Sequence, residues 1–140
     1  MISVYRSSGT ASNPLMVSGN AFRDGGPSSS GSGIMVGDNG GAHIVVRENT
    51  LFDPGQVGIG VPGGTGIKVL GNSVFSNSHA WSNVGIYVWN QSGGSCGDIE
   101  VRGNSVEWYS ADGSPNPSWD GGNCGTVSGW EDNDWSASLG

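Results

Sequence analysis

Five asparagines recur along the chain at nearly regular intervals and in the same local setting. Four of them, Asn20, Asn49, Asn72 and Asn104, follow a stretch of alternating apolar residues and directly follow a Gly or Glu; the pattern decays around Asn133. Successive asparagines are 29, 23, 32 and 29 residues apart. A repeat of this length with two-residue strand periodicity predicts a solenoid, in which each repeat buries its apolar face by stacking on the next.

A second motif, Gly-Ile-x-Val, alternates with the first. It occurs at residues 33–36, 58–61 and 85–88, and a Gly pair follows each copy. We therefore expect three short strands in each coil: this motif, the alternating stretch before the Asn, and a short stretch after it. Alternate Ile and Val side chains of a strand point the same way, so they would form inward stacks. Residues 1–140 are predicted to form a single domain of about five such coils, either complete or part of a longer protein.

The asparagines themselves suit the corner between the second and third strands. Asn tolerates left-handed backbone angles and hydrogen-bonds to nearby backbone. Placed above one another in successive coils, the five side chains would form an amide ladder. No segment has the 3.6-residue periodicity of a helix, which excludes alternating strands and helices. A β-sandwich stays open as an alternative, although it does not predict asparagines in the same phase.

The two motifs, Gly-Ile-x-Val and Ile-x-Val-x-Gly-Asn-x-Val, resemble the repeats of the right-handed parallel β-helix, the fold of the pectate-lyase-like superfamily. The resemblance covers roughly residues 2–135 and implies an all-β solenoid. That superfamily contains polysaccharide lyases, glycosidases, epimerases, adhesins and phage tail proteins. The resemblance therefore implies a fold and leaves the activity open.

Amino-acid composition limits which molecules the protein can bind and in which cellular compartment it is expected. The net charge of −7 and the pI near 4.3 exclude nucleic acid and anionic membrane surfaces, which require basic patches. No run of residues is long enough for a transmembrane helix, and the first residues do not resemble a signal peptide. A surface rich in Ser, Asn, Gly and Trp and poor in Lys is typical of extracellular or periplasmic proteins. We therefore expect a secreted protein whose export signal is absent from this sequence.

The two cysteines lie at equivalent places in successive repeats. Cys96 and Cys124 each follow a Gly pair by two residues. Neighbouring strands are about 4.8 Å apart, which a disulfide can span. The spacing predicts a Cys96–Cys124 bridge and, with it, an oxidising compartment. The alternative is two free buried thiols.

The resemblance also implies where a ligand would bind, because ligands of this superfamily commonly lie along the outside of the first strand. The residues that this implies are Tyr87, Trp89, Asn90, Gln91, Trp119 and Asp120. Aromatic rings stack on the apolar face of a sugar, and amides bind its hydroxyl groups. In the alternative interpretation Trp89 and Trp119 only stack on each other.

Few residues of the sequence meet the requirements of a lyase or hydrolase active site. A lyase of this superfamily would need a basic residue on the first strand's outward face, and none of the five Lys and Arg residues falls there. A hydrolase needs two carboxylates about 5 to 9.5 Å apart, and Asp24 and Asp38 are the candidates that remain. No metal site or cofactor is predicted, although the acidic residues 131–134 leave calcium open. Enzymatic activity therefore stays undecided.

Two functions from different classes follow. The first is a secreted β-helix module that binds a polysaccharide, or a short relative of polysaccharide-processing enzymes. The second is an assembly module without catalytic activity. Ile2 and Val4 begin a strand with no polar cap before them, and a solenoid needs its ends covered. We expect self-association through this N-terminal coil, or a larger protein, whereas Trp130, Trp135 and Leu139 would close the other end.

Overall fold

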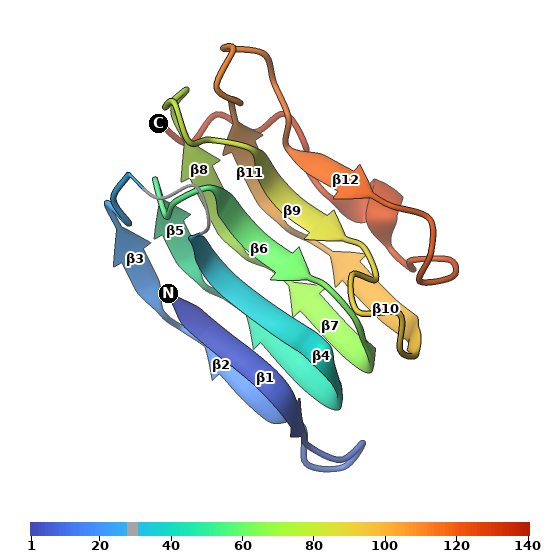
Figure 1. The fold of residues 1–140 in the computed structure, drawn as a ribbon. Coiled ribbons are helices and arrows are strands. Elements are labelled where there is room, and N and C mark those ends of the chain that lie inside the picture. Colours follow the sequence, from blue (N-terminus) through green and yellow to red (C-terminus); the bar gives the residue numbers. More distant parts are fainter. Residues whose placement is uncertain (28–30) are drawn as a thin grey trace.

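The structure is a computed structural model that describes residues 1–27 and 31–140. In these ranges the chain forms short strands and one 3-10 helix, and the coils follow one another along a single axis (Figure 1). The strands are β1 (Ile2–Ser8), β2 (Leu15–Ser18), β3 (Ala21–Arg23), β4 (Ser32–Arg47), β5 (Thr50–Phe52), β6 (Val57–Val61), β7 (Gly64–Leu70), β8 (Ser73–Ser76), β9 (Val84–Val88), β10 (Cys96–Arg102), β11 (Ser105–Trp108) and β12 (Ser118–Asp120), and the helix is η1 (Trp130–Asp132).

Every strand pairs in parallel with the equivalent strand of a neighbouring coil. The first strands of the coils pair in the order β1, β4, β6, β9 and β12, and the second strands in the order β2, β4, β7 and β10. The third strands form a separate sheet in the order β3, β5, β8 and β11. The predicted all-β parallel solenoid is confirmed, with four complete turns and a partial fifth. The fifth turn consists of β12 and isolated bridges at Ser128 and Asp134.

Strand β4 differs from the expected pattern because it spans both the first and the second strand of its coil. Its pairing with β1 continues past the Gly pair, with Ser7 opposite Gly41 and Ser8 opposite Ala42, but the register shifts on both sides of Tyr5. Positive φ angles at Gly37, Gly40 and Gly41 (83°, 101° and 122°) turn the chain there. In this coil the corner is a bend within a continuous strand.

The core is built from like residues stacked in register. Ile34 pairs with Ile59, and Ile59 with Ile86. The inward Ile and Val side chains of the middle coils are fully buried, and burying each one stabilises the fold by about 1.5 to 3 kcal/mol. The hydrophobic residues that are 0% exposed are Ile34, Val36, Ile44, Val46, Leu51, Ile59, Val61, Ile67, Val69, Val74, Ile86, Val88, Val101 and Val106.

The predicted amide ladder is present along the whole solenoid. The side-chain oxygen of Asn72 accepts hydrogen bonds from the backbone N–H and the side-chain amide of Asn49, at 3.0 and 2.9 Å. Asn72 makes the same pair of bonds to Asn104, and its amide also donates to the carbonyl of Val46 at 3.1 Å. Asn20 and Asn133 continue the ladder at its two ends. Each coil is therefore tied to the next by buried polar bonds beside the apolar stack.

The corner uses a different residue from the one expected for its left-handed angle. The residue before the Asn has a positive φ, 67° at Gly19, 64° at Gly71 and 70° at Gly103. Glu48 takes the same angle, with φ 56°, in the second coil. The asparagines themselves are not left-handed, because their side chains must reach along the solenoid axis. Glycine adopts such an angle without steric cost, which explains the Gly-Asn pairs.

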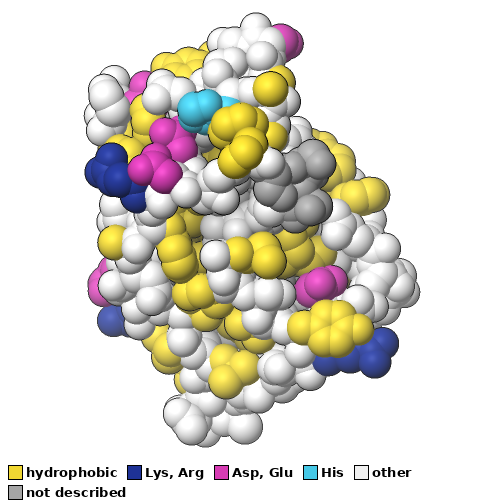
Figure 2. Space-filling model, turned by 60° about the vertical axis from the view of Figure 1, so that its left-hand side comes forward, with side chains coloured by type: hydrophobic (Ala, Val, Ile, Leu, Met, Phe, Trp, Pro, Cys, Tyr) yellow, Lys and Arg dark blue, Asp and Glu magenta, His cyan; other side chains and the backbone are white. Residues whose placement is uncertain are grey.

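The two ends of the solenoid differ. At the C-terminal end the Trp130 and Trp135 rings lie 5.0 Å apart and pack against the core. The Trp135 indole donates to the Trp130 carbonyl at 3.1 Å, so these rings close that end as expected. Leu139 acts through its backbone instead, donating to Glu107 Oε1 at 2.6 Å. At the N-terminal end hydrophobic side chains gather in the middle of the face (Figure 2).

Candidate functional site

The outward face of the first strands forms a continuous row across four coils. Met35 of β4 is in register with Gly60 of β6, Gly60 with Tyr87 of β9, and Tyr87 with Trp119 of β12. Met35, Gly60 and Tyr87 each lie between two buried core residues of their strand, and neighbouring side chains of a strand point to opposite faces. Trp119 belongs to the row through its register with Tyr87, because its own neighbours Ser118 and Asp120 are not core residues. The structure therefore places Tyr87 and Trp119 on the face predicted from the sequence.

Tyr87 lies in this row but is buried. Its ring covers Gly60, where a Cβ atom would stand 2.6 Å from the ring, and its hydroxyl donates to Met35 Sδ at 3.8 Å. Only 5% of Tyr87 is exposed. This burial raises the pKa of Tyr87 to about 12; the charge of Asp38 also raises it, and a hydrogen bond with Gln91 opposes the shift. Tyr87 is therefore an uncharged, buried ring that lies beneath the exposed side chains of this face.

Trp89 and Trp119 are the exposed aromatic groups of the face. They are 38% and 46% exposed, and their ring centroids lie 5.3 Å apart with the planes at 51°. Trp89 also leans over Gly121, where a Cβ would stand 2.4 Å from its ring. The two indoles do contact each other, as one interpretation expected, but a large part of each ring still faces solvent.

A pocket of about 230 Å³ adjoins this aromatic pair. Its lining consists of Ser32, Met35, Gln56, Val57, Asn83, Val84, Tyr87, Trp89, Gln91 and Trp119. None of these ten side chains is charged. The three amides, a hydroxyl and the indoles can hydrogen-bond a polar neutral ligand, whereas Met35, Val57 and Val84 provide apolar surface. The pocket therefore combines apolar surface with several converging hydrogen-bonding groups, which can fix the orientation of a ligand.

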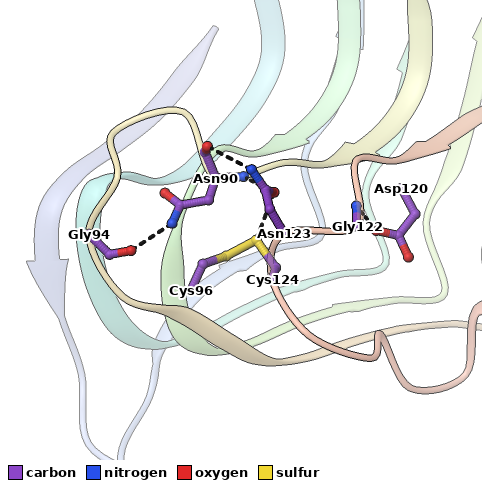
Figure 3. Close-up of a disulfide and its surroundings, with 7 residues drawn as sticks. All are labelled: Asn90, Gly94, Cys96, Asp120, Gly122, Asn123 and Cys124. Atoms are coloured by element: carbon purple, nitrogen blue, oxygen red, sulfur yellow. Dashed lines mark hydrogen bonds between the residues drawn. A yellow bond between two sulfur atoms is a disulfide. The ribbon is translucent and has the colours of Figure 1, made fainter.

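Asn90 and Asp120, both expected at the site, organise turns instead of lining the pocket. Asn90 donates its amide to the carbonyl of Gly94 at 2.6 Å, and its backbone exchanges hydrogen bonds with the side chain of Asn123 at 2.8 and 3.2 Å (Figure 3). Asp120 accepts from the backbone N–H of Gly122 at 2.9 Å. Their contacts hold the chain segments that follow Trp89 and Trp119.

The predicted disulfide is present between the fourth and fifth coils. Cys96 and Cys124 are joined with their Cα atoms 4.6 Å apart, close to one strand spacing (Figure 3). Cys124 is 1% exposed and belongs to the core. The bridge fastens the partial fifth coil, which carries Trp119, to the regular coils. It also fits an oxidising environment outside the cytoplasm.

The two candidate catalytic carboxylates are not brought together. Asp24 follows β3 and its backbone N–H donates to the carbonyl of Phe52 at 3.1 Å. Asp38 lies beyond the first-strand part of β4, in register with Tyr5. The extended segment 32–36 separates their positions and alone spans about 13 Å, more than glycosidase carboxylates allow. The structure gives this pair no support as a hydrolytic centre.

Several residues of the region escaped the sequence reasoning. Gln56 and Asn83 of the pocket occupy equivalent positions, each directly before Val-Gly-Ile, and this repeat could have revealed them. Asp53 was also missed: its Oδ1 accepts from the backbone of Asn77 at 2.9 Å and lies 3.0 Å from His79 Nε2. The ring of His79 stacks on Trp81 at 4.7 Å. This cluster fixes the loop before β9.

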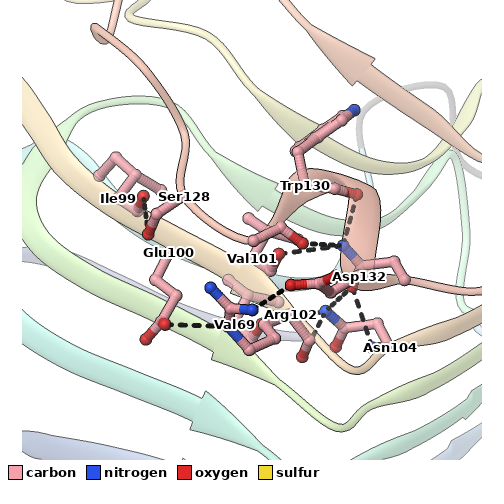
Figure 4. A network of polar contacts seen from close by, with 11 residues as sticks. Val69, Ile99, Glu100, Val101, Arg102, Asn104, Ser128, Trp130 and Asp132 are labelled. Carbon is pink, nitrogen blue, oxygen red and sulfur yellow. Dashed lines mark hydrogen bonds and ion pairs between the residues drawn. The ribbon is translucent and has the colours of Figure 1, made fainter.

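One residue of the acidic C-terminal segment, Asp132, is engaged in an ion pair. Asp132 pairs with Arg102, which also bonds Glu100 at 3.2 Å (Figure 4). In residues 1–27 and 31–140 no group of three His, Cys, Asp or Glu residues is arranged to hold a metal ion. In the same ranges no helix is long and apolar enough to cross a membrane. The pocket beside Trp89 and Trp119 is therefore the strongest candidate site.

The sequence was compared with models of known protein families. Residues 5–106 match the model of the right-handed β-helix region. The chain belongs to the right-handed β-helix family. The match covers most of the chain, including Tyr87, Trp89 and Cys96, but ends before Trp119 and the second cysteine. No curated protein and no solved structure matched the chain. Membership of the β-helix family accounts for the winding and the stacked strands and assigns no activity.

Proposed function

We propose that this β-helix protein binds a neutral or weakly charged polysaccharide along the outward face of its first strands. The observation that carries the proposal is the exposed pair Trp89 and Trp119 beside an uncharged pocket. Indole faces pack against the apolar face of a sugar ring, and their N–H groups remain free to bond hydroxyls. The amides of Gln56, Asn83 and Gln91 supply further hydroxyl contacts.

Charge favours a neutral ligand over an acidic one. The protein carries a net charge of −7, so a polyanion would be repelled at long range. The lining of the pocket contains no Lys or Arg to offset that repulsion. The long row from Met35 to Trp119 crosses four coils, and neighbouring coils are about 4.8 Å apart. An extended chain of several sugar units therefore fits better than a single sugar.

An extracellular or periplasmic location supports this function. The disulfide forms and persists in oxidising compartments, where polysaccharides of cell surfaces and surroundings are also found. The low content of Lys and Arg, five residues in 140, agrees with the same location. Secretion and glycan binding are therefore proposed together.

A glycan array tests the proposal. We expect the wild-type protein to bind one class of neutral or weakly charged glycan, and Trp119→Ala to weaken that binding by about tenfold, as expected when about 1.4 kcal/mol of stacking is lost. Tyr5→Ala, compared at a protein concentration at which both variants are monomeric, is the matched control, because Tyr5 is an aromatic residue that is 50% exposed and lies on the first coil. Absence of binding to every glycan, or unchanged binding by Trp119→Ala, would refute the proposal.

Binding without turnover is the expected behaviour. The positions of Asp24 after β3 and of Asp38 beyond the first-strand part of β4 support this expectation, because a glycosidase requires two carboxylates close together. We expect no cleavage of polysaccharides with or without calcium, measured by the release of reducing ends and of unsaturated products. Turnover that survives Asp38→Asn and Asp24→Asn would mean that catalysis uses residues other than this pair.

A further inference from the structure

The N-terminal coil presents core-type residues that residues 1–27 and 31–140 leave partly exposed. Ile2 and Val4 of β1 and Leu15 of β2 point inward yet are only partly buried. Their register partners Ile34, Val36 and Ile44 are 0% exposed. The hydrophobic patch in Figure 2 lies on this end of the solenoid. An exposed apolar surface of this kind, ringed by polar groups, is typical of an interaction site.

Apolar exposure continues around the outside of the same coil. Met1, Tyr5 and Met16 are 74%, 50% and 48% exposed. In the described part of the chain they account for three of the five large hydrophobic side chains that are exposed. The patch thus extends from the open end of the core onto the flanks of β1 and β2.

Polar groups at this end are also left without partners. Each middle asparagine of the ladder accepts two hydrogen bonds on its side-chain oxygen, whereas Asn20 Oδ1 accepts none from residues 1–27 and 31–140. In those ranges β1, β2 and β3 pair on one side only. Open strand edges favour association with another chain.

Charge is distributed unevenly along the solenoid. Residues 1–27 contain Arg6 and Arg23 and one acidic residue, Asp24, in a protein of net charge −7. Residues 107–140 contain six acidic residues and no Lys or Arg. The acidic residues are Glu107, Asp112, Asp120, Glu131, Asp132 and Asp134. The two ends of the solenoid are therefore electrostatically complementary.

We propose that the N-terminal coil docks onto the C-terminal end of a second copy of this chain. Trp130 and Trp135, which are half-buried there, supply apolar surface for the open core. Glu131 and Asp134, which lie beside the Asp132–Arg102 ion pair, face Arg6 and Arg23. A head-to-head pair would instead bring the arginines of both copies together, which like-charge repulsion opposes. Because such a contact uses two different surfaces, it continues into an open chain of molecules. This assembly goes beyond the proposed glycan binding and does not depend on it.

Sedimentation velocity over a range of protein and salt concentrations tests the assembly. We expect masses above the monomer that increase with protein concentration and decrease as salt rises from about 0.02 M to about 1 M, because screening weakens charge contacts. Arg6→Glu with Arg23→Glu is expected to weaken association by about tenfold or more. Glu131→Lys with Asp134→Lys is expected to weaken it to a similar extent. Arg47→Glu with Lys68→Glu, on the middle coils, is the control with the same charge change as the arginine pair and should associate normally.

Mixing the two end variants gives the most specific readout. Each variant alone has one altered end, but the intact basic end of one fits the intact acidic end of the other. We therefore expect association to return in a 1:1 mixture. A chain that is monomeric at all concentrations overturns the proposal, and so does association that the control weakens equally. If the arginine variant loses association while the variant Glu131→Lys with Asp134→Lys keeps it, the contact is head-to-head, and this result would also overturn the proposal.

Discussion

At the scale of single residues, buried asparagine side chains link each coil to the next. Asn49, Asn72 and Asn104 are each about 1% exposed, and each side chain bonds both to the next Asn and to a backbone carbonyl of the preceding coil. Buried polar groups are stabilising only when all their partners are present. The ladder therefore fixes the register of the coils as well as their stability.

Replacing a central ladder residue should be costly. Asn72→Ala removes the acceptor of the Asn49 backbone N–H and side-chain amide, and it removes the amide that donates to Asn104 Oδ1 and to the Val46 carbonyl. We expect the free energy of unfolding in urea to fall by about 3 kcal/mol or more, since each unpaired buried group costs about 1 to 3 kcal/mol. Asn20→Ala, at the half-exposed end of the ladder, is the control and should cost clearly less. Equal losses for the two variants would contradict the ladder's role.

The burial of Tyr87 predicts how the stability of the folded protein depends on pH. Its pKa is raised from 10.0 to about 12 in the folded protein, so the folded state holds the proton more tightly than the unfolded state. The stabilisation from neutral Tyr87 is complete below about pH 10 and is lost as the pH rises towards 12. Absorbance titration at 295 nm should show a phenolate signal near pH 12 that is missing in Tyr87→Phe. A Tyr87 signal centred near pH 10 in the folded protein would be inconsistent with its burial.

At the scale of elements, short strands are held in place by their neighbours rather than by their own sequence preferences. The fifth coil is the weakest case: β12 has three residues, and the rest of that coil pairs only through isolated bridges among the described residues. The disulfide compensates for this, because it ties Cys124 of that coil to β10. The aromatic pair of the candidate site thus depends on a covalent link between coils.

Removing the disulfide should loosen this coil. A bridge closing 28 residues stabilises a fold by about 3 to 4 kcal/mol in the chain-entropy model. We expect Cys96→Ala with Cys124→Ala to lower the free energy of unfolding by that amount and to reduce any glycan affinity that uses Trp119. Reduction of the wild-type protein should reproduce both effects. A loss of less than about 1 kcal/mol would mean that packing alone holds the fifth coil.

Sequence patterns predicted these elements well where they repeat. The stacked Ile and Val, the ladder and the cysteine pairing all follow from residues that recur at one phase, because the solenoid places equal phases in contact. The burial and contacts of residues outside the repeat were harder to predict from the sequence. Tyr87 was expected to be available to ligand, but only the structure reveals that Gly60 in the preceding coil lets its ring lie flat and buried. Asp24 and Asp38 were paired by residue type alone, although the repeat motif at residues 33–36 lies between them in the sequence.

At the scale of the whole molecule, the solenoid separates its surfaces along one axis. The uncharged aromatic face lies on the first strands, towards the C-terminal coils, and the basic, apolar coil lies at the N-terminal end. Binding along the side and assembly through the ends can therefore occur together. An assembled row of molecules would extend the aromatic face and increase the avidity for a long polysaccharide through multiple contacts.

The central claim is that glycan contacts Trp89 and Trp119, and the indole signals of the six tryptophans test it most directly. We would record ¹H–¹⁵N spectra during titration with an oligosaccharide, assigning the peaks with single Trp→Phe variants. The account predicts saturable shifts of the Trp89 and Trp119 indole N–H peaks, while those of Trp130 and Trp135 stay fixed. Indole peaks that never move with any glycan, or that move only at Trp130 and Trp135, would contradict it.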